Sequence, residues 1–172
     1  NGRVSVDGRV LDSPAFLVNK ESSVLVDGKL VSENHSQNLW RYHKPPGLLT
    51  THHDPQGRET VFSSLPGDLG RVISVGRLDL NSEGLLLLTN DGELSRFLEK
   101  SNWLRKYRVR VYGRPNIKHL NSLSNGITLD GINYKGIKVE LTSQKGSNAW
   151  LQVALTEGKN KEIRRILSHF DL

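Results

Sequence analysis

The acidic residue Asp79 stands on a short polar turn between two apolar runs. The runs cover residues 72–75 and 85–88, and both are bordered by glycine. Short continuous apolar runs of this kind are typical of strands buried on both faces. A carboxylate at the rim of such a sheet is held rigidly and remains reachable, which suits a catalytic group. The alternative is that Asp79 only organises the turn, because Asp commonly bonds its own backbone there; the spacing alone leaves both interpretations open.

Three further motifs flank this segment in order along the chain. Upstream is Tyr-His-Lys-Pro-Pro-Gly at residues 42–47, and downstream are Lys-Tyr-Arg-Val at 106–109 and Glu-Gly-Lys-Asn-Lys-Glu-Ile-Arg-Arg at 157–165. Together with Gly-Arg-Leu-Asp at residues 76–79, they resemble the signatures of the pseudouridine synthases, in the branch that modifies bacterial ribosomal RNA. Each motif alone is weak, but all of them in the expected order make a specific signal.

The resemblance implies a role for each motif. It assigns the catalytic nucleophile to Asp79, the active-site tyrosine to Tyr107, and the arginine that faces the nucleophile to Arg164. It also implies that Tyr107 stacks on an extruded uracil, near the proton that leaves carbon 5. A guanidinium beside Asp79 would favour its ionised form and fix its direction. From the residues alone, Tyr107 is equally well a core aromatic, and a surface helix cation is the preferred interpretation of Arg164.

The implied reaction needs no redox carrier, nucleotide or metal, because pseudouridine is an isomer of uridine. We therefore predict no cofactor and no metal site. The chain has no Cys and no glycine-rich phosphate-binding motif, and its six His are not spaced as a ligand set. Two alternatives from other classes remain. One is an RNA-binding module without catalysis, and the other is a hydrolase that uses Asp79 with Glu83.

The pattern of apolar residues predicts an α+β fold, in which strands dominate and helices intervene irregularly. Beside the two strands that flank Asp79, we expect strands at residues 39–43, 107–112, 136–141 and 150–155. Helices are expected at residues 60–65, after Asp91, at 117–124 and at 161–170. The resemblance implies one long, mixed, mostly antiparallel sheet with the active cleft across its middle.

Residues 1–34 contain two segments in which β-branched residues enter an Asp-Gly turn, a strong hairpin signal. They resemble the C-terminal half of the alpha-L RNA-binding domain. We therefore interpret residues 1–34 as a remnant of that domain, 32–38 as a polar linker and 38–172 as the catalytic domain. The Arg-rich helices expected before the strands are absent, and the chain stops at Leu172, which indicates truncation at both ends.

The positive charge of the chain is unevenly spread. The formal net charge is +6: residues 1–37 hold four Lys/Arg and five Asp/Glu, a net of −1, and residues 38–172 hold twenty and thirteen, a net of +7. From charge alone a solvated basic surface is the simpler interpretation, but beside the motifs an RNA track is favoured. Lys44 is also expected to shape the cleft wall, and Arg77 to hold the displaced RNA strand. The predicted RNA contacts are Lys44, Arg77, Arg105, Lys106, Arg108, Arg110, Lys159, Lys161 and Arg165.

A uridine in folded RNA must be unstacked to reach Asp79, which implies base flipping. Residues 42–66 are most similar to the branch that acts on 23S rRNA of the large subunit, and the small-subunit 16S enzyme is the alternative. We expect a cytoplasmic monomer that needs no protein partner. No membrane contact is expected, since no apolar run approaches the roughly 18 residues that span a bilayer.

Overall fold

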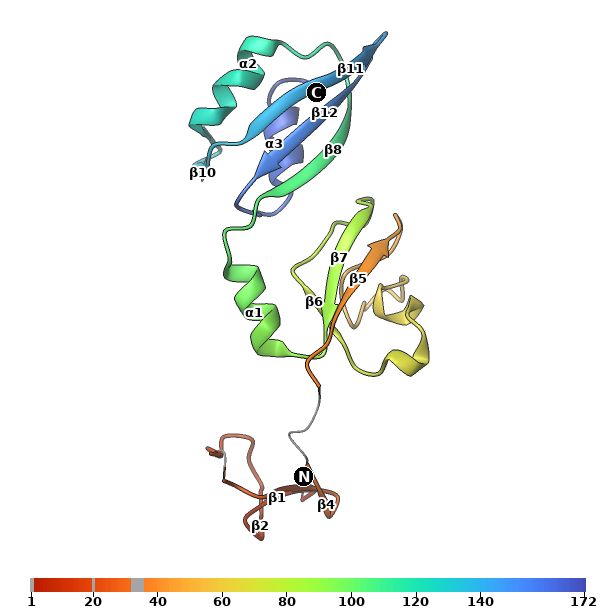
Figure 1. The fold of residues 1–172 in the computed structure, drawn as a ribbon, viewed down its shortest axis with the longest axis vertical. Coiled ribbons are helices and arrows are strands. Elements are labelled where there is room, and N and C mark those ends of the chain that lie inside the picture. The colour runs from red at the N-terminus through yellow and green to blue at the C-terminus, as the bar shows by residue number, and fades with distance from the viewer. Residues whose placement is uncertain (1, 20, 32–35) are drawn as a thin grey trace. The chain divides into compact units, whose positions relative to one another are not determined.

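The computed structural model describes residues 2–19, 21–31 and 36–172. These form two compact units, Asn1–Asn38 and Leu39–Leu172, and Figure 1 shows the elements of each. Most of the linker predicted at residues 32–38 lies outside the described residues. None of the helices in the described ranges has the length and apolar character that crossing a bilayer requires.

The first unit is a small sheet built from two hairpins. Asp7-Gly8 and Asp27-Gly28 form the turns, with φ of 49° and 82° in the first and 51° and 75° in the second. Left-handed conformations at both turn residues match the twist of a two-residue hairpin, so both predicted hairpins are confirmed. The strands lie in the order β2-β1-β3-β4; they are β1 (Val4–Val6), β2 (Arg9–Val10), β3 (Val24–Val26) and β4 (Lys29–Leu30). Assignment of this unit to an alpha-L domain stays a prediction.

The second unit begins with a three-stranded antiparallel sheet of order β5-β7-β6. Its strands are β5 (Leu39–Lys44), β6 (Ile73–Val75) and β7 (Gly84–Thr89), and α1 (Gly92–Lys100) follows. The Asp91 carboxylate accepts the Leu94 N–H at 2.8 Å and caps α1. Leu86 and Leu88 are buried on one face, whereas Leu85 is 65% exposed. Burial on both faces was therefore a wrong prediction for β7.

A segment without long elements covers the buried face of this sheet. It contains the 3-10 turns η1 (Phe62–Ser64) and η2 (Gly67–Leu69) in place of the helix predicted at residues 60–65. The Thr60 hydroxyl accepts the Ser63 N–H at 3.1 Å, but the N-cap residue of η1 is Val61, which makes no side-chain cap. Val61, which is fully buried, packs with Leu86 and Leu88 in the core of this sheet.

A second three-stranded antiparallel sheet has the order β11-β12-β8. Its strands are β8 (Arg105–Tyr112), β11 (Lys138–Lys145) and β12 (Asn148–Leu155). The inner face of this sheet packs against α2 (Ile117–Ser122), η3 (Leu123–Asn125) and α3 (Glu162–Ser168). In Figure 1, α3 lies behind the strands. One hairpin, β9 (Ile127–Leu129) with β10 (Ile132–Tyr134), was not predicted from the sequence.

The predicted α+β class and the antiparallel pairing are confirmed, with one difference. The expected long sheet is divided into two three-stranded sheets, and the one parallel pairing among the described residues is an isolated bridge between Leu49 and Thr60. Asp79 lies in the connection from β6 to β7 in the first sheet, and the chain then crosses through α1 into the second. Groups from both sheets can therefore meet.

Candidate active site

Asp79 lies on a loop whose backbone is fixed at several points. The Ser82 N–H donates to the Asp79 carbonyl at 3.0 Å, which closes a tight turn. The Gly47 N–H donates to the Leu80 carbonyl at 2.8 Å, and the Thr50 hydroxyl donates to the Leu78 carbonyl at 2.9 Å. The Asp79 side chain remains 31% exposed. The loop therefore presents a carboxylate that is reachable but held in a defined place.

Lys44 binds the backbone of the same loop through its ammonium group. Its side chain is fully buried, and its Nζ donates to the carbonyls of Leu80, Ser82 and Pro45 at 3.2, 2.9 and 3.0 Å. Burial lowers the pKa of Lys44, and the nearby Asp79 carboxylate opposes this shift. The prediction that Lys44 contacts RNA is contradicted, since all its donors face protein carbonyls. Its expected role in the cleft wall agrees with this placement.

Arg164, on α3, lies opposite Asp79. Its Nε is 3.5 Å from Asp79 Oδ2, and its side chain is 56% exposed. At 3.5 Å the two side chains form a long ion pair. A substrate group can therefore enter and bind either side chain. The exposed guanidinium is available to Asp79 from a helix that begins more than eighty residues later in the chain.

Tyr107 comes to the same place from the inner face of β8. It pairs with Val153, which is fully buried, and packs against the core of the second sheet. Burial raises the pKa of Tyr107; Arg105 opposes the shift, and Glu162 and Asp79 add to it. The phenol therefore stays protonated at neutral pH, as a hydrogen-bond donor within electrostatic reach of Asp79. All three residues predicted for catalysis thus gather in one place.

Glu162, at the start of α3, is a buried carboxyl that the sequence analysis missed. It is 3% exposed, and its Oε2 accepts the Lys159 N–H at 2.8 Å. Burial raises its pKa, and the neighbouring Glu157 carboxylate adds to that shift. Because Glu162 fixes the turn that enters α3, it positions the helix that carries Arg164. The three-residue spacing of Lys159 and Glu162, similar to a capping box, was the available signal.

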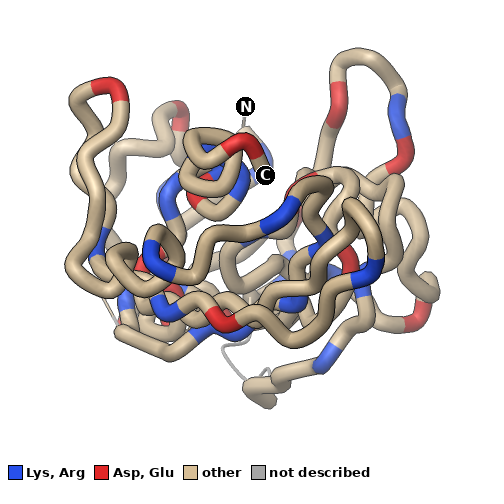
Figure 2. Tube along the Cα trace, turned by 90° about the horizontal axis from the view of Figure 1, so that it is seen from above, with Lys and Arg blue, Asp and Glu red and all other residues tan. Residues whose placement is uncertain are grey.

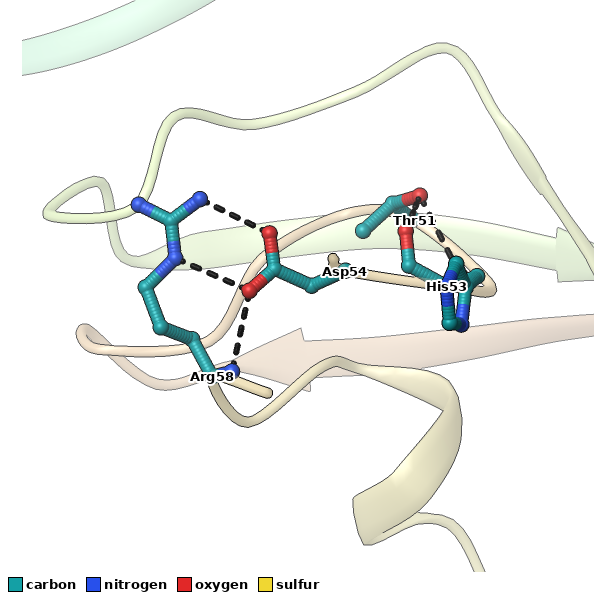
Figure 3. Close-up of polar contacts among 4 residues, drawn as sticks. All are labelled: Thr51, His53, Asp54 and Arg58. Atoms are coloured by element: carbon teal, nitrogen blue, oxygen red, sulfur yellow. Dashed lines mark hydrogen bonds and ion pairs between the residues drawn. The ribbon is translucent and has the colours of Figure 1, made fainter. Parts of the chain in front are cut away.

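The segment of residues 51–58 forms a loop that is held by several hydrogen bonds. Figure 3 shows three hydrogen bonds from Arg58 to the Asp54 carboxylate. The Arg58 Nη2, Nε and backbone N–H donate them at 2.7, 3.0 and 2.9 Å. These bonds from Arg58 lower the pKa of Asp54 to about 2. The Thr51 hydroxyl donates to the His53 carbonyl at 2.9 Å. The loop follows Thr50 directly and is therefore a rigid neighbour of the Asp79 loop.

The cations predicted to contact RNA are divided between different surfaces. On β8, Lys106, Arg108 and Arg110 are exposed, and strand alternation places them on the face opposite Tyr107. Arg105 is on the Tyr107 face and donates to the Thr156 carbonyl at 2.9 Å. The RNA contacts predicted on β8 therefore lie on both faces of the strand, with Lys106, Arg108 and Arg110 together on one of them. Exposed cations elsewhere are Arg77, Lys159, Lys161 and Arg165; Figure 2 marks Lys and Arg in blue.

The described residues contain no group of three or more His, Asp or Glu suited to hold a metal ion. Glu83, the second carboxylate of the hydrolase alternative, has an Oε1 that lies 3.0 Å from His43 Nε2. The groups that do gather are one carboxylate, one guanidinium and one phenol. This set can attack or stabilise an electron-poor carbon and orient a planar ring.

Comparison with known proteins identifies the family. The model of the RNA pseudouridylate synthase family matches residues 38–169. The chain belongs to this family of enzymes. An RNA pseudouridine synthase of Rickettsia prowazekii, itself uncharacterised, is 50% identical over 173 residues, which cover 99% of this chain and 73% of that protein. The predicted family and enzyme class are therefore confirmed, and the hydrolase alternative is dropped.

Two further matches refine the placement of this synthase. The ribosomal large subunit pseudouridine synthase B of Vibrio vulnificus is 42% identical over 173 residues, which cover 96% of this chain and 54% of that protein. The chain thus spans about half the length of that relative. A crystal structure of a pseudouridylate synthase shares the fold with a TM-score of 0.73 at 21% identity, covering 99% of this chain and 73% of that one.

Proposed function

We propose that this synthase converts a uridine of bacterial ribosomal RNA to pseudouridine, with Asp79 as the nucleophile. The observation that carries the proposal is the meeting of Asp79, Tyr107 and Arg164, which come from separate elements of the two sheets. Asp79 and Arg164 form an ion pair at 3.5 Å, and Asp79 contributes to the raised pKa of Tyr107. A half-buried tyrosine and a fully buried lysine beside one partly exposed carboxylate form a preorganised site.

The reaction exchanges one bond to the sugar for another. The bond from uracil N1 to ribose C1′ breaks, the ring turns, and C5 bonds to C1′; the proton on C5 then leaves, and N1 gains a proton. Asp79 serves as the nucleophile or stabilises the charged sugar species. Arg164, whose Nε lies 3.5 Å from Asp79 Oδ2, directs the carboxylate. Tyr107 stacks on the free uracil, with its hydroxyl near the C5 proton.

The substrate we propose is 23S rRNA. Two relatives support this choice: the ribosomal large subunit pseudouridine synthases B of Vibrio vulnificus and Haemophilus influenzae are 42% and 43% identical to this chain. The target uridine must leave its stack to reach Asp79, and the exposed Arg77, two residues before Asp79, would hold the displaced strand. The proposed enzyme acts as a cytoplasmic monomer without a cofactor.

The decisive experiment is tritium release from 23S rRNA transcripts labelled at carbon 5 of uridine. The chain should release tritium and Asp79→Asn should not, while Asp68→Asn, which removes the same charge from an exposed position in η2, should retain release. Equal tritium release from 16S and 23S transcripts would contradict the assignment of 23S rRNA as the substrate. Release by Asp79→Asn at the rate of the parent chain would contradict the nucleophile.

A further inference from the structure

The second sheet has an outer face that the catalytic site does not use. Pairing of β8, β12 and β11 places Trp150 beside Arg110 and Ser143, and Gln152 beside Arg108 and Glu140. The inner face carries Tyr107, Val153 and other core residues. Because side chains alternate along a strand, the outer residues cannot reach the catalytic groups on the inner face.

The outer face is strongly basic. Lys106, Arg108 and Arg110 stand on β8, and Lys138 and Lys145 on β11, against one carboxylate, Glu140, which pairs with Lys138 at 2.9 Å. These five cations and one anion give a net of +4. A surface of this charge attracts the phosphates of a nucleic acid.

An aromatic platform lies among these cations. The Arg108 guanidinium lies 4.2 Å from the centre of the Trp150 ring, and Tyr112 on the same face is 75% exposed. Both Nε and Nη2 of Arg110 donate to Asn148 Oδ1, at 3.1 and 2.9 Å, so its position is also fixed. Unpaired bases stack on aromatic rings and on the flat face of Arg.

A shallow hollow of about 570 Å³ crosses the same strands. It is lined by Lys106, Arg108, Thr142, Ser143 and Gln152, with the intervening Tyr107. The bulge between Leu141 and Ser143 in β11 interrupts the regular ladder at this point. The hydroxyl and amide groups can hydrogen-bond to a base whose ring stacks nearby, whatever its identity.

We propose that the outer face of the β11-β12-β8 sheet binds a single-stranded segment of RNA, with Arg108 and Trp150 as the stacking platform. This inference extends the proposed function and rests on it, because the bound segment would flank the uridine delivered to Asp79. Basic side chains hold its phosphates and the platform holds its bases. The surface reads no sequence, and it serves to retain RNA on the enzyme.

The test uses labelled oligoadenylate, which contains no uridine for the catalytic site. Fluorescence anisotropy should show Trp150→Leu binding at least tenfold more weakly, equivalent to about 1.4 kcal/mol. Trp103→Leu, at a Trp that is 58% exposed outside this sheet, is the matched control and should bind normally. Thermal melts establish that both variants are folded.

A second pair of substitutions guards against a folding defect in Trp150→Leu. Lys106→Gln with Arg108→Gln changes two exposed side chains, and it should flatten the slope of log K against log salt by about 1.4, since each lost cation accounts for about 0.7. The inference would be overturned if the parent chain did not bind oligoadenylate. It would also be overturned if Trp150→Leu and the paired Gln variant both bound as tightly as the parent chain. If this face binds a protein and not RNA, substitutions on it should leave oligoadenylate binding unchanged.

Measuring oligoadenylate binding and tritium release on the same variants distinguishes this inference from the proposed function. Asp79→Asn should bind oligoadenylate normally and release no tritium from uridine. If the parent chain bound oligoadenylate through Trp150 but released no tritium, the proposed function would fail and the RNA surface would stand. If it released tritium, but neither Trp150→Leu nor the paired Gln variant weakened oligoadenylate binding, the proposed function would stand and the RNA surface would fail.

Discussion

Lys44→Met is the substitution that most directly tests how the Asp79 loop is held. Met has nearly the length of the Lys side chain and fills the same space without its donors. The carbonyls of Pro45, Leu80 and Ser82 would lose the buried ammonium that now binds all of them. Leu80 and Ser82 lie within three residues of Asp79, so the loss falls on the loop that carries the nucleophile.

The expected loss of stability follows from those contacts. A hydrogen bond to a charged group contributes about 1.5–3 kcal/mol, so three contribute about 5–9 kcal/mol. Removing the ammonium also removes its own cost of burial, several kcal/mol, which is the cost that lowers the pKa of Lys44. The net loss is therefore about 2–4 kcal/mol. At about 4 °C per kcal/mol for a unit of this size, Tm should fall by about 8–16 °C.

Catalysis should suffer more than stability. If the freed loop shifts Asp79 by about 1 Å, the rate of tritium release should fall about 100-fold at a temperature where the variant is folded. Lys118→Met, at an exposed lysine of α2, is the control and should change neither quantity. If Lys44→Met and Lys118→Met had equal Tm values and equal rates, the structural role assigned to Lys44 would be refuted.

Three other predictions test separate parts of the structure. Tyr107→Phe keeps the ring and should keep the KM for RNA, whereas Tyr107→Leu loses about 1–3 kcal/mol of stacking and should raise it about tenfold or more. Gly136→Ala places a Cβ 2.1 Å from the Ser124 carbonyl oxygen, so urea unfolding should show a loss of about 1–3 kcal/mol or more. The pKa of Asp54 is lowered by Arg58 from 3.8 to about 2; its contribution to stability is complete above pH 3.8 and is lost as pH falls through about 2, which carboxyl ¹³C NMR would follow. A titration midpoint of Asp54 near pH 3.8 would contradict the lowering of its pKa by Arg58.

The elements that sequence could predict are those with a local signal. Asp91 before an amphipathic run gave α1, and two Asp-Gly turns gave the hairpins of the first unit. The missed β9–β10 hairpin has the same signal at Asp130-Gly131, with φ of 50° and 74°, so local chemistry was sufficient there too. By contrast, the exposure of Leu85 depends on which segments cover the sheet, and a run of four leucines carries no information about that.

The candidate site divides in the same way. The motifs placed Asp79, Tyr107 and Arg164 correctly near one another, although their roles stay proposals. The burial of Lys44 was beyond the sequence, because a lysine before two prolines looks the same whether it faces solvent or three carbonyls. Glu162 was missed for a related reason. The three-residue spacing from Lys159 indicates the turn that enters α3, but the burial of the carboxyl comes from the packing of α3 on the second sheet, which that spacing does not express.

The arrangement also explains why catalysis should be sensitive to distant changes in packing. Asp79 is fixed to the first sheet through Lys44 and Thr50, while Tyr107 and Arg164 belong to the second sheet and its helix. The 3.5 Å separation of Asp79 and Arg164 therefore depends on how the two sheets are placed relative to one another, since no single element contains both residues. A shift of about 1 Å between the sheets leaves each core intact but removes the productive geometry. Substitutions in either core should lower the rate of isomerisation before they lower the fraction folded.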